Sequence, residues 1–168
     1  ACNGAVVLMS WPLPARRAAG LIAGMNSQSK SLSAVGLVLQ AAHFSADKHR
    51  DQRRKGVRNT PYINHPLEVA EKLNRVGGVE DARVLVAAIL HDTIEDTETT
   101  EAELARVFGR EVARLVAELT EDKAPHWTAR KRHEIDGAPH LSPAAKLIKL
   151  ADKTCNVADT AANPPGDW

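Results

Sequence analysis

The sequence predicts an all-α protein, a bundle of six or seven helices. Strand-type alternation of apolar and polar residues is nearly absent, and neither an internal repeat nor a low-complexity tract is found in the 168 residues. Apolar residues recur instead at helical spacing, and capping residues stand where several of these helices would begin. A chain of this length is sufficient for one domain with one hydrophobic core.

The composition excludes several classes of protein. Twenty-two Lys and Arg residues against 21 Asp and Glu give a formal charge of +1, so no global charge favours nucleic acid or an anionic membrane as a partner. No run of about 18 apolar residues occurs, which argues against a membrane-spanning helix. The two cysteines, Cys2 and Cys155, lie far apart in the sequence, so we expect no disulfide framework and a reducing, cytoplasmic location.

The two ends of the chain differ from the rest. Residues 1–30 begin without Met and lack a basic stretch before their apolar run, so they make a poor signal peptide. We interpret them as a disordered extension or a misassigned start. We expect one domain over residues 31–168. Because "TAANPPGDW" ends on a Pro-Pro-Gly turn without a closing element, we expect this domain to be truncated at its C-terminus.

The first two predicted helices flank a basic loop. The first spans Ser33–Arg50, with Ser33 as its N-cap and an inward stripe formed by Val35, Val38 or Leu39, Ala42 and Ala46. The loop "DQRRKGVRNTPYIN" follows, and its last residue, Asn64, can cap the helix "HPLEVAEKLNRV". That helix ends at Gly77-Gly78, and its predicted inward face is formed by Leu67, Ala70, Leu73 and Val76.

The next predicted helix is the central one. It runs from about Glu80 to Ile94 and is apolar on nearly all sides across "VLVAAIL", which is typical of a buried helix. Thr100 and Glu103 then form a capping box for a short helix, and Gly109 separates it from the amphipathic helix "EVARLVAELTED".

A basic linker, "RKRH" at 130–133, leads to the last helix, and we assign its charges to a solvated helix face. Ser142 and Pro143 supply a capping serine and a first-turn proline for "AAKLIKLADKTCNVADTA". The predicted inward side chains of this helix are Leu147, Leu150, Ala151 and Thr154.

The segment "HDTIED" at 91–96 places unusual charge at the end of the central helix. Its spacing puts Asp92, Glu95 and Asp96 within one helical turn, with His91 stacked over Glu95. Clustered carboxylates beside an apolar run repel one another and are costly to desolvate, so this arrangement calls for a cation. His91 and Asp92 offer an imidazole and a carboxylate, which are the ligands of a divalent metal.

Two further residues are candidate metal ligands, His65 in "PYINHP" and Asp152 in "KLADK". Each also has a structural interpretation without a metal. His65 could be a capping or core histidine bonded to a backbone carbonyl, and Asp152, between Lys149 and Lys153, could form a solvated salt-bridging face. The residues alone leave both interpretations open.

The order of these motifs resembles a known family. From Ala41 to Asp159 the chain is similar to the HD-domain phosphohydrolases of the RelA/SpoT type, especially the small stand-alone alarmone hydrolases that include the metazoan SpoT homologue. The resemblance is carried by the stretches "AAHFSADKHRDQRRKG", "TPYINHPLEVA", "AAILHDTIEDT", "FGREVARLVAELTEDK" and "APHLSPAAKLIKLADKTCNVAD".

The resemblance implies an HD-domain helical bundle and a metal-dependent reaction. The substrate would be guanosine tetraphosphate or pentaphosphate, hydrolysed at the 3′-diphosphate to give GDP or GTP and pyrophosphate. The implied metal is manganese, and the implied ligands are His65, His91, Asp92 and Asp152. Glu95 and Asp96 would orient and deprotonate the attacking water, the alternative being a solvated acidic helix end.

The substrate carries many negative charges, so a cationic loop is expected. The segment "QRRKG" offers Arg53, Arg54 and Lys55 to grip phosphate or stack on a base, unless it is a solvated charge run. Lys149 is a further candidate phosphate contact. Asn156, four residues after Asp152, could position ribose or phosphate, or bond to a neighbouring backbone carbonyl.

Three other functions remain open at this point. The chain could be an HD phosphohydrolase of another nucleotide, the N-terminal hydrolase part of a bifunctional synthetase and hydrolase, or a non-catalytic nucleotide-binding module. The intact "HDTIED" argues against the last of these. Trp127 stands where close relatives tend to carry a basic residue, which removes one expected phosphate contact. We expect no nucleic-acid or membrane partner, and the oligomeric state is open.

Overall fold

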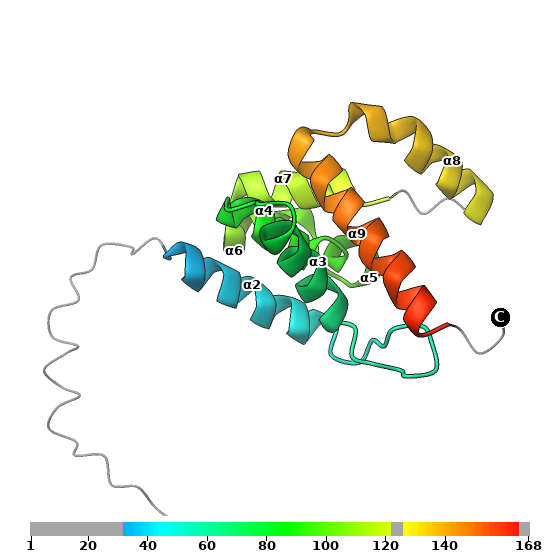
Figure 1. Ribbon diagram of the computed structural model, residues 1–168. Coiled ribbons are helices and arrows are strands. Elements are labelled where there is room, and N and C mark those ends of the chain that lie inside the picture. The colour runs from blue at the N-terminus through cyan, green and yellow to red at the C-terminus, as the bar shows by residue number, and fades with distance from the viewer. Residues whose placement is uncertain (1–31, 122–125, 165–168) are drawn as a thin grey trace, which may run out of the picture. The chain divides into compact units, whose positions relative to one another are not determined.

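A computed structural model describes residues 32–121 and 126–164, and within these ranges the protein is all-α, as predicted (Figure 1). The predicted extension at residues 1–30 lies outside them. In chain order the elements are α2 (Ala34–Lys48), α3 (Asn64–Arg75), α4 (Ala82–Leu90), α5 (Thr93–Asp96), α6 (Glu101–Phe108), α7 (Arg110–Leu119), α8 (Trp127–Gly137), the 3-10 helix η1 (Ala138–His140) and α9 (Pro143–Ala162).

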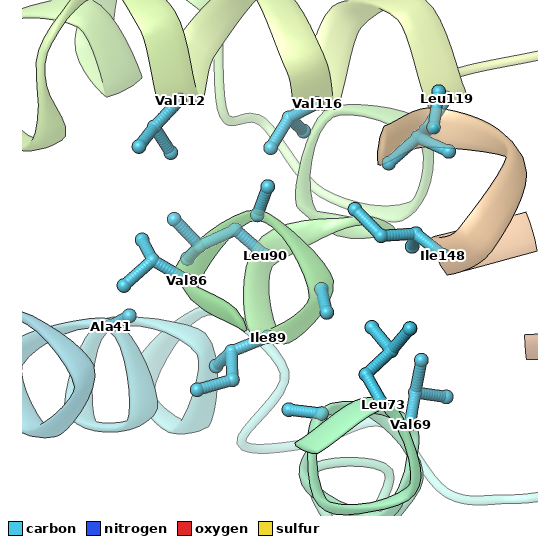
Figure 2. Close-up of a cluster of buried hydrophobic side chains, with 14 of the residues drawn as sticks. Ala41, Val69, Leu73, Val86, Ile89, Leu90, Val112, Val116, Leu119 and Ile148 are labelled. Carbon is cyan, nitrogen blue, oxygen red and sulfur yellow. The ribbon is translucent and has the colours of Figure 1, made fainter. Parts of the chain in front are cut away.

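Helix α4 is the centre of the hydrophobic core. Its residues Val86 to Leu90 are all buried, at 2% exposure or less. Figure 2 shows the side chains of α2, α3, α7 and α9 directed toward it, with Val112 and Val116 of α7 opposite Val86 and Leu90. Because each fully buried Val, Leu or Ile contributes roughly 1.5–3 kcal/mol, this contact fixes the end of α4 rigidly in the bundle.

The predicted helix starts are largely confirmed by their caps. The side-chain oxygens of Ser33, Thr100 and Ser142 accept hydrogen bonds from the backbone N–H groups of Gly36, Glu103 and Ala145, at 3.1, 3.2 and 3.3 Å. Asn64 begins α3 without a side-chain cap bond. These caps satisfy backbone donors that a helix start leaves unpaired.

Two predicted segments differ in the structure. The central helix ends at Leu90 rather than near Ile94, and a turn at His91 and Asp92 separates it from the short α5. The stretch predicted as a basic linker is part of α8, although the exposure predicted for its charges is observed at residues 131–133.

The predicted inward faces of α2, α3 and α9 are partly wrong. On α3, Leu67 and Val76 are exposed, and Val69 is buried besides the predicted Ala70 and Leu73. On α2, Val35 and Leu39 are exposed, and Ala41 and Ser45 are buried instead. On α9, the exposed side chains include Leu147, Leu150 and Thr154, and the buried ones are Ala145, Ile148, Ala151, Asp152 and Cys155. The buried stripe of α9 contains a carboxylate, which a count of hydrophobic residues assigns to solvent. Asp152 is buried because it contacts His65 of α3, at 3.0 Å.

No helix in the described part of the chain is long and apolar enough to cross a membrane.

Candidate metal centre and its cleft

A cleft of about 550 Å³ opens between the basic loop, the start of α3, the turn after α4, α5 and α9. Every residue predicted for the site lines it. These residues are Arg53, Arg54, Lys55, His65, His91, Asp92, Glu95, Asp96, Lys149, Asp152 and Asn156.

His91 lies at the floor of the cleft, directly after α4. Its Nδ1–H donates to the carbonyl of Ala88 at 2.8 Å, so the neutral ring presents the lone pair of Nε2. That Nε2 atom is buried and has no hydrogen-bond partner, although Asp92 Oδ2 lies 2.9 Å away. A backbone bond on one ring nitrogen and an orphaned second nitrogen are the arrangement expected of a metal-ligating histidine.

The other three candidate ligands come from separate elements. His65, in the first turn of α3, places Nε2 3.0 Å from Asp152 Oδ1 on α9 and 3.9 Å from Asp92 Oδ2. His91 Nε2 is 3.8 Å from the same Asp152 oxygen. The donor atoms of His65, His91 and Asp152 all lie within 4.8 Å of one another.

This donor set fits a divalent cation. Ligand bonds of about 2.0–2.2 Å around one ion put neighbouring donor atoms roughly 3–4 Å apart, which matches the separations observed. The charges agree with this fit. Burial opposes protonation of His91, but the carboxylates of Asp92 and Asp152 outweigh it and raise its pKa to about 9. The cluster therefore stabilises positive charge at its centre, and nitrogen with carboxylate oxygen suits mid-row divalent metals.

Two side chains hold the carboxylates of this cluster in place. The hydroxyl of Tyr62 donates to Asp92 Oδ2 at 2.5 Å, and the amide of Asn156 donates to Asp152 Oδ1 at 2.6 Å. The predicted alternative for Asn156, a bond to a backbone carbonyl, is not what the structure shows. Sequence reasoning missed Tyr62, although it lies three residues before His65 in "PYINHP".

Glu95 and Asp96 lie on α5 and line the same cleft as the four candidate metal ligands, His65, His91, Asp92 and Asp152, which we call the metal cluster. Burial and the nearby carboxylates raise the pKa of Glu95, whose Oε2 accepts a 3.3 Å hydrogen bond from the N–H of Glu121. Asp96 is exposed, and its Oδ2 accepts from the side-chain amide of Gln52 at 2.8 Å. A carboxylate with a raised pKa is a better proton acceptor than an ordinary one.

Gln52 is itself held by a histidine. Its Oε1 lies 2.6 Å from Nδ1 of the buried His49, and because Oε1 only accepts, Nδ1–H is the donor. This contact fixes which end of the Gln52 amide faces Asp96. Neither Gln52 nor His49 is a residue that the sequence pattern singled out.

The three basic residues of the loop differ in their surroundings. Arg54 is bound to α9, since its guanidinium donates to Asp159 Oδ2 at 3.0 Å and to Asn156 Oδ1 at 2.8 Å. Arg53 is exposed and donates to two backbone carbonyls of its own loop. Lys55 is exposed at the cleft. Lys149, on α9, pairs with Glu121 at 2.7 Å.

The end of α9 holds this loop closely. Asn163 Oδ1 accepts from the N–H of Arg58 at 3.0 Å, and Gly56 has φ of +121° against the same residue. A Cβ on Gly56 would lie 2.6 Å from the Asn163 carbonyl oxygen, so only glycine fits there. Polar residues recur at spacings of four, three and four along α9 and its C-cap, at Asp152, Asn156, Asp159 and Asn163. We call them the polar stripe. One end of the stripe belongs to the metal cluster, and the other end contacts the basic loop.

Two histidines and two aspartates that meet in one cleft of an all-α core form a candidate metal centre of the HD class. The family model described as "HD domain" matches residues 41–167, and the chain belongs to this family. Within it, the curated proteins that the chain resembles include several named guanosine-3′,5′-bis(diphosphate) 3′-pyrophosphohydrolase MESH1.

The Xenopus tropicalis protein of that name is 50% identical over 136 residues, which cover 81% of this chain and 76% of the relative. The human protein of that name is 52% identical over 131 residues, covering 78% and 73%. A solved structure described as "A metazoan ortholog of SpoT hydrolyzes ppGpp and plays a role in starvation responses" superimposes with a TM-score of 0.77 at 40% identity, over 83% of this chain and 78% of that one. The family predicted from the sequence motifs is confirmed.

Proposed function

We propose that this protein hydrolyses guanosine 3′,5′-bis(diphosphate) at the 3′-diphosphate, giving GDP and pyrophosphate, and acts likewise on the pentaphosphate to give GTP. The observation that carries the proposal is that the HD-domain match, residues 41–167, contains every predicted site residue. The substrate class follows from the relatives that carry this activity in their name and are half identical in sequence.

The residues that would hold the metal are His65, His91, Asp92 and Asp152. We propose manganese, because two imidazole nitrogens and two carboxylates are ligands that suit a mid-row divalent ion. When bound, such an ion supplies Lewis acidity and offsets the charge of phosphate oxygens. The buried orphaned Nε2 of His91 and the short donor separations support this assignment.

Glu95 and Asp96 are assigned to proton transfer. The raised pKa of Glu95 lets it accept a proton from the attacking water, and Asp96, oriented by Gln52, holds that water in line with the phosphorus. Both carboxylates face the cleft beside the metal cluster.

The basic loop and the polar stripe of α9 are assigned to the nucleotide. Lys55 is exposed at the cleft and can contact phosphate. The guanidinium carbon of Arg54 lies over the Tyr62 ring, 5.7 Å from its centroid, and from this position Arg54 can bind a base or phosphate. Arg53, Lys149 and Asn156 line the same cleft and complete the proposed substrate contacts.

The buried free thiol of Cys155 supports a reducing, cytoplasmic location. We propose no nucleic-acid or membrane partner.

Product identification tests the proposal. Purified protein loaded with manganese is incubated with guanosine tetraphosphate, with the pentaphosphate and with a panel of ordinary nucleotides. We expect GDP and pyrophosphate from the first substrate, no orthophosphate, and no turnover after Asp152→Asn. Hydrolysis of an ordinary nucleotide, with guanosine tetraphosphate untouched at full metal content, would overturn the substrate assignment.

A further inference from the structure

Glu134 on α8 lies among three lysines that line the cleft, and it lines a neighbouring pocket to which Lys149 and Lys153 also contribute. Glu134 contacts Lys131 at 2.7 Å, Lys153 at 2.5 Å and Lys149 at 3.8 Å. Its side chain is only 15% exposed, whereas those of Lys131 and Lys153 are 54% and 44% exposed. Solvent therefore reaches two of the lysines while the carboxylate fills the space between all three.

Three ammonium groups converging on one anion are an arrangement that suits a phosphate group. Lysine is a point-charge donor to phosphate, and several lysines can share its oxygens. Two other carboxylates neutralise this group, since Glu121 pairs with Lys149 at 2.7 Å and Asp152 Oδ2 lies 3.6 Å from Lys153 Nζ. The three lysines therefore balance three carboxylates, and displacement of the Glu134 carboxylate would leave one positive charge without a partner, which favours an anion in its place.

The position of the lysines places this arrangement next to the reacting centre. Lys149 and Lys153 flank the metal-cluster residue Asp152 on α9, and Lys153 Nζ is 3.6 Å from Asp152 Oδ2. All three lysines line the cleft that contains the metal cluster. A phosphate group of a nucleotide whose diphosphate lies at the cluster is within reach of them.

We propose that Glu134 is an internal competitor, whose carboxylate occupies the subsite of a substrate phosphate group and gives way when that group binds. The inference rests on the proposed function for the identity of the substrate, but the anion subsite itself does not depend on turnover. Because α8 contributes Glu134 and Lys131 whereas α9 contributes Lys149 and Lys153, binding at this subsite couples the two helices.

A role for Glu134 in positioning the lysines, rather than in competing with the substrate, predicts the opposite change in anion binding. If Glu134 serves to position the lysines for the substrate, removing its charge loosens them and weakens anion binding. If it competes with the substrate, removing its charge frees them and strengthens binding. Glu134→Gln keeps the side-chain shape and distinguishes the two roles. Asp136→Asn is a matched control, since Asp136 is an exposed residue of the same helix and the change in net charge is the same.

The first measurement uses inorganic phosphate and pyrophosphate as probes, with metal-loaded protein at constant ionic strength. We expect Glu134→Gln to bind both about 5-fold more tightly by calorimetry, the size of effect that one partly exposed charge pair gives. Asp136→Asn should bind as the unmodified protein does. Adding Lys131→Met to Glu134→Gln should reverse the gain, because it removes one of the freed ammonium groups. Unchanged or weaker binding by Glu134→Gln would overturn the proposal.

The second measurement is kinetic. For guanosine tetraphosphate we expect Glu134→Gln to lower KM about 5-fold with kcat changed less than 2-fold, since the competitor acts on binding rather than on the reaction. A raised KM would overturn the proposal. If the protein hydrolyses no guanosine tetraphosphate at all, the proposed function fails, and the phosphate titration still decides whether Glu134 competes for the subsite.

Discussion

Replacing Tyr62 with phenylalanine would test whether the residues around the metal cluster control metal affinity. The Tyr62 hydroxyl donates at 2.5 Å to Asp92 Oδ2, the same oxygen that lies 2.9 Å from His91 Nε2. Phenylalanine keeps the ring and removes only this bond, so Asp92 is free to rotate away from the cluster.

The size of the effect follows from the kind of bond that is lost. A hydrogen bond to a charged group contributes about 1.5–3 kcal/mol, which corresponds to roughly a 10- to 100-fold change in an equilibrium constant. Loss of the bond also makes the carboxylate more basic, which by itself strengthens metal binding. Substitution of such supporting residues typically costs about 10–100-fold in affinity, so the loss of orientation outweighs the gain in basicity.

The assay is a titration with manganese in a chelator buffer. We expect Tyr62→Phe to bind manganese about 10–100-fold more weakly and to recover most of its kcat at saturating manganese, because Tyr62 does not carry out the reaction. Thr154→Val is the control, since it removes an exposed hydroxyl of α9 that bonds only to the carbonyl of Leu150. Equal dissociation constants for the unmodified protein and Tyr62→Phe would refute the reasoning.

Other expectations concern the metal, the carboxylates and the lysines. Chelation should lower the melting temperature, and manganese should restore it. At a free metal concentration 100 times the dissociation constant, binding should add about 2.7 kcal/mol to the free energy of unfolding. Identical melting curves with and without chelator would contradict metal binding by these residues. Asp152→Asn should lose metal and activity, whereas Glu95→Gln should keep the metal and lose turnover. Elemental analysis and kinetics measure the two effects, and equal metal loss in both variants would contradict these separate roles. Replacing Arg54 and Lys55 with alanine should weaken substrate binding by about 2–4 kcal/mol. Because Asp159 of α9 already neutralises Arg54, we expect Lys55 to account for the salt dependence of binding, and a salt-independent loss of affinity in Lys55→Ala would contradict this. Burial raises the pKa of Glu134, but its lysine neighbours outweigh burial and lower it from 4.5 to about 2. The ionised carboxylate therefore contributes stability that is complete above about pH 4.5 and is lost as the pH falls toward 2, so urea unfolding should show the difference between the unmodified protein and Glu134→Gln shrinking over that range.

The fold class and most helix boundaries could be predicted because they depend on local pattern. Ser33, Thr100 and Ser142 act within three residues of themselves, so the sequence alone is sufficient to place them. The central position of α4 follows from its uniform apolarity, which leaves no side for solvent. The turn at His91 could not be predicted, because His91 and Asp92 leave the helix toward partners on α3 and α9 that are remote in sequence.

The candidate metal ligands could be identified from their residue types together with the family resemblance, and the structure brings them into one cleft. The supporting residues could not be identified, because their partners are far away in the chain. Tyr62 bonds to a residue 30 positions on, Gln52 to one 44 positions on and Arg54 to one 105 positions on. Such pairings arise only when the helices of the bundle pack together, so they cannot be predicted from periodicity in the sequence. The same cause accounts for the wrong face of α9, where the burial of Asp152 depends on His65.

The polar stripe of α9 also fixes the separation between the candidate metal ligands and the basic loop. A helix rises about 1.5 Å per residue, so the seven positions from Asp152 to Asp159 separate the metal cluster from the anchor of the basic loop by about 10 Å along the helix axis. Inserting or deleting one residue between them would rotate the far end by about 100° and carry Asp159 and Asn163 away from the loop. For a substrate bound as proposed, the distance between the phosphate at the metal and the part of the nucleotide at the loop would therefore be set by the rise of one helix. A substitution along the stripe would leave this spacing intact, whereas a change in the length of the helix would separate the candidate metal ligands from the loop.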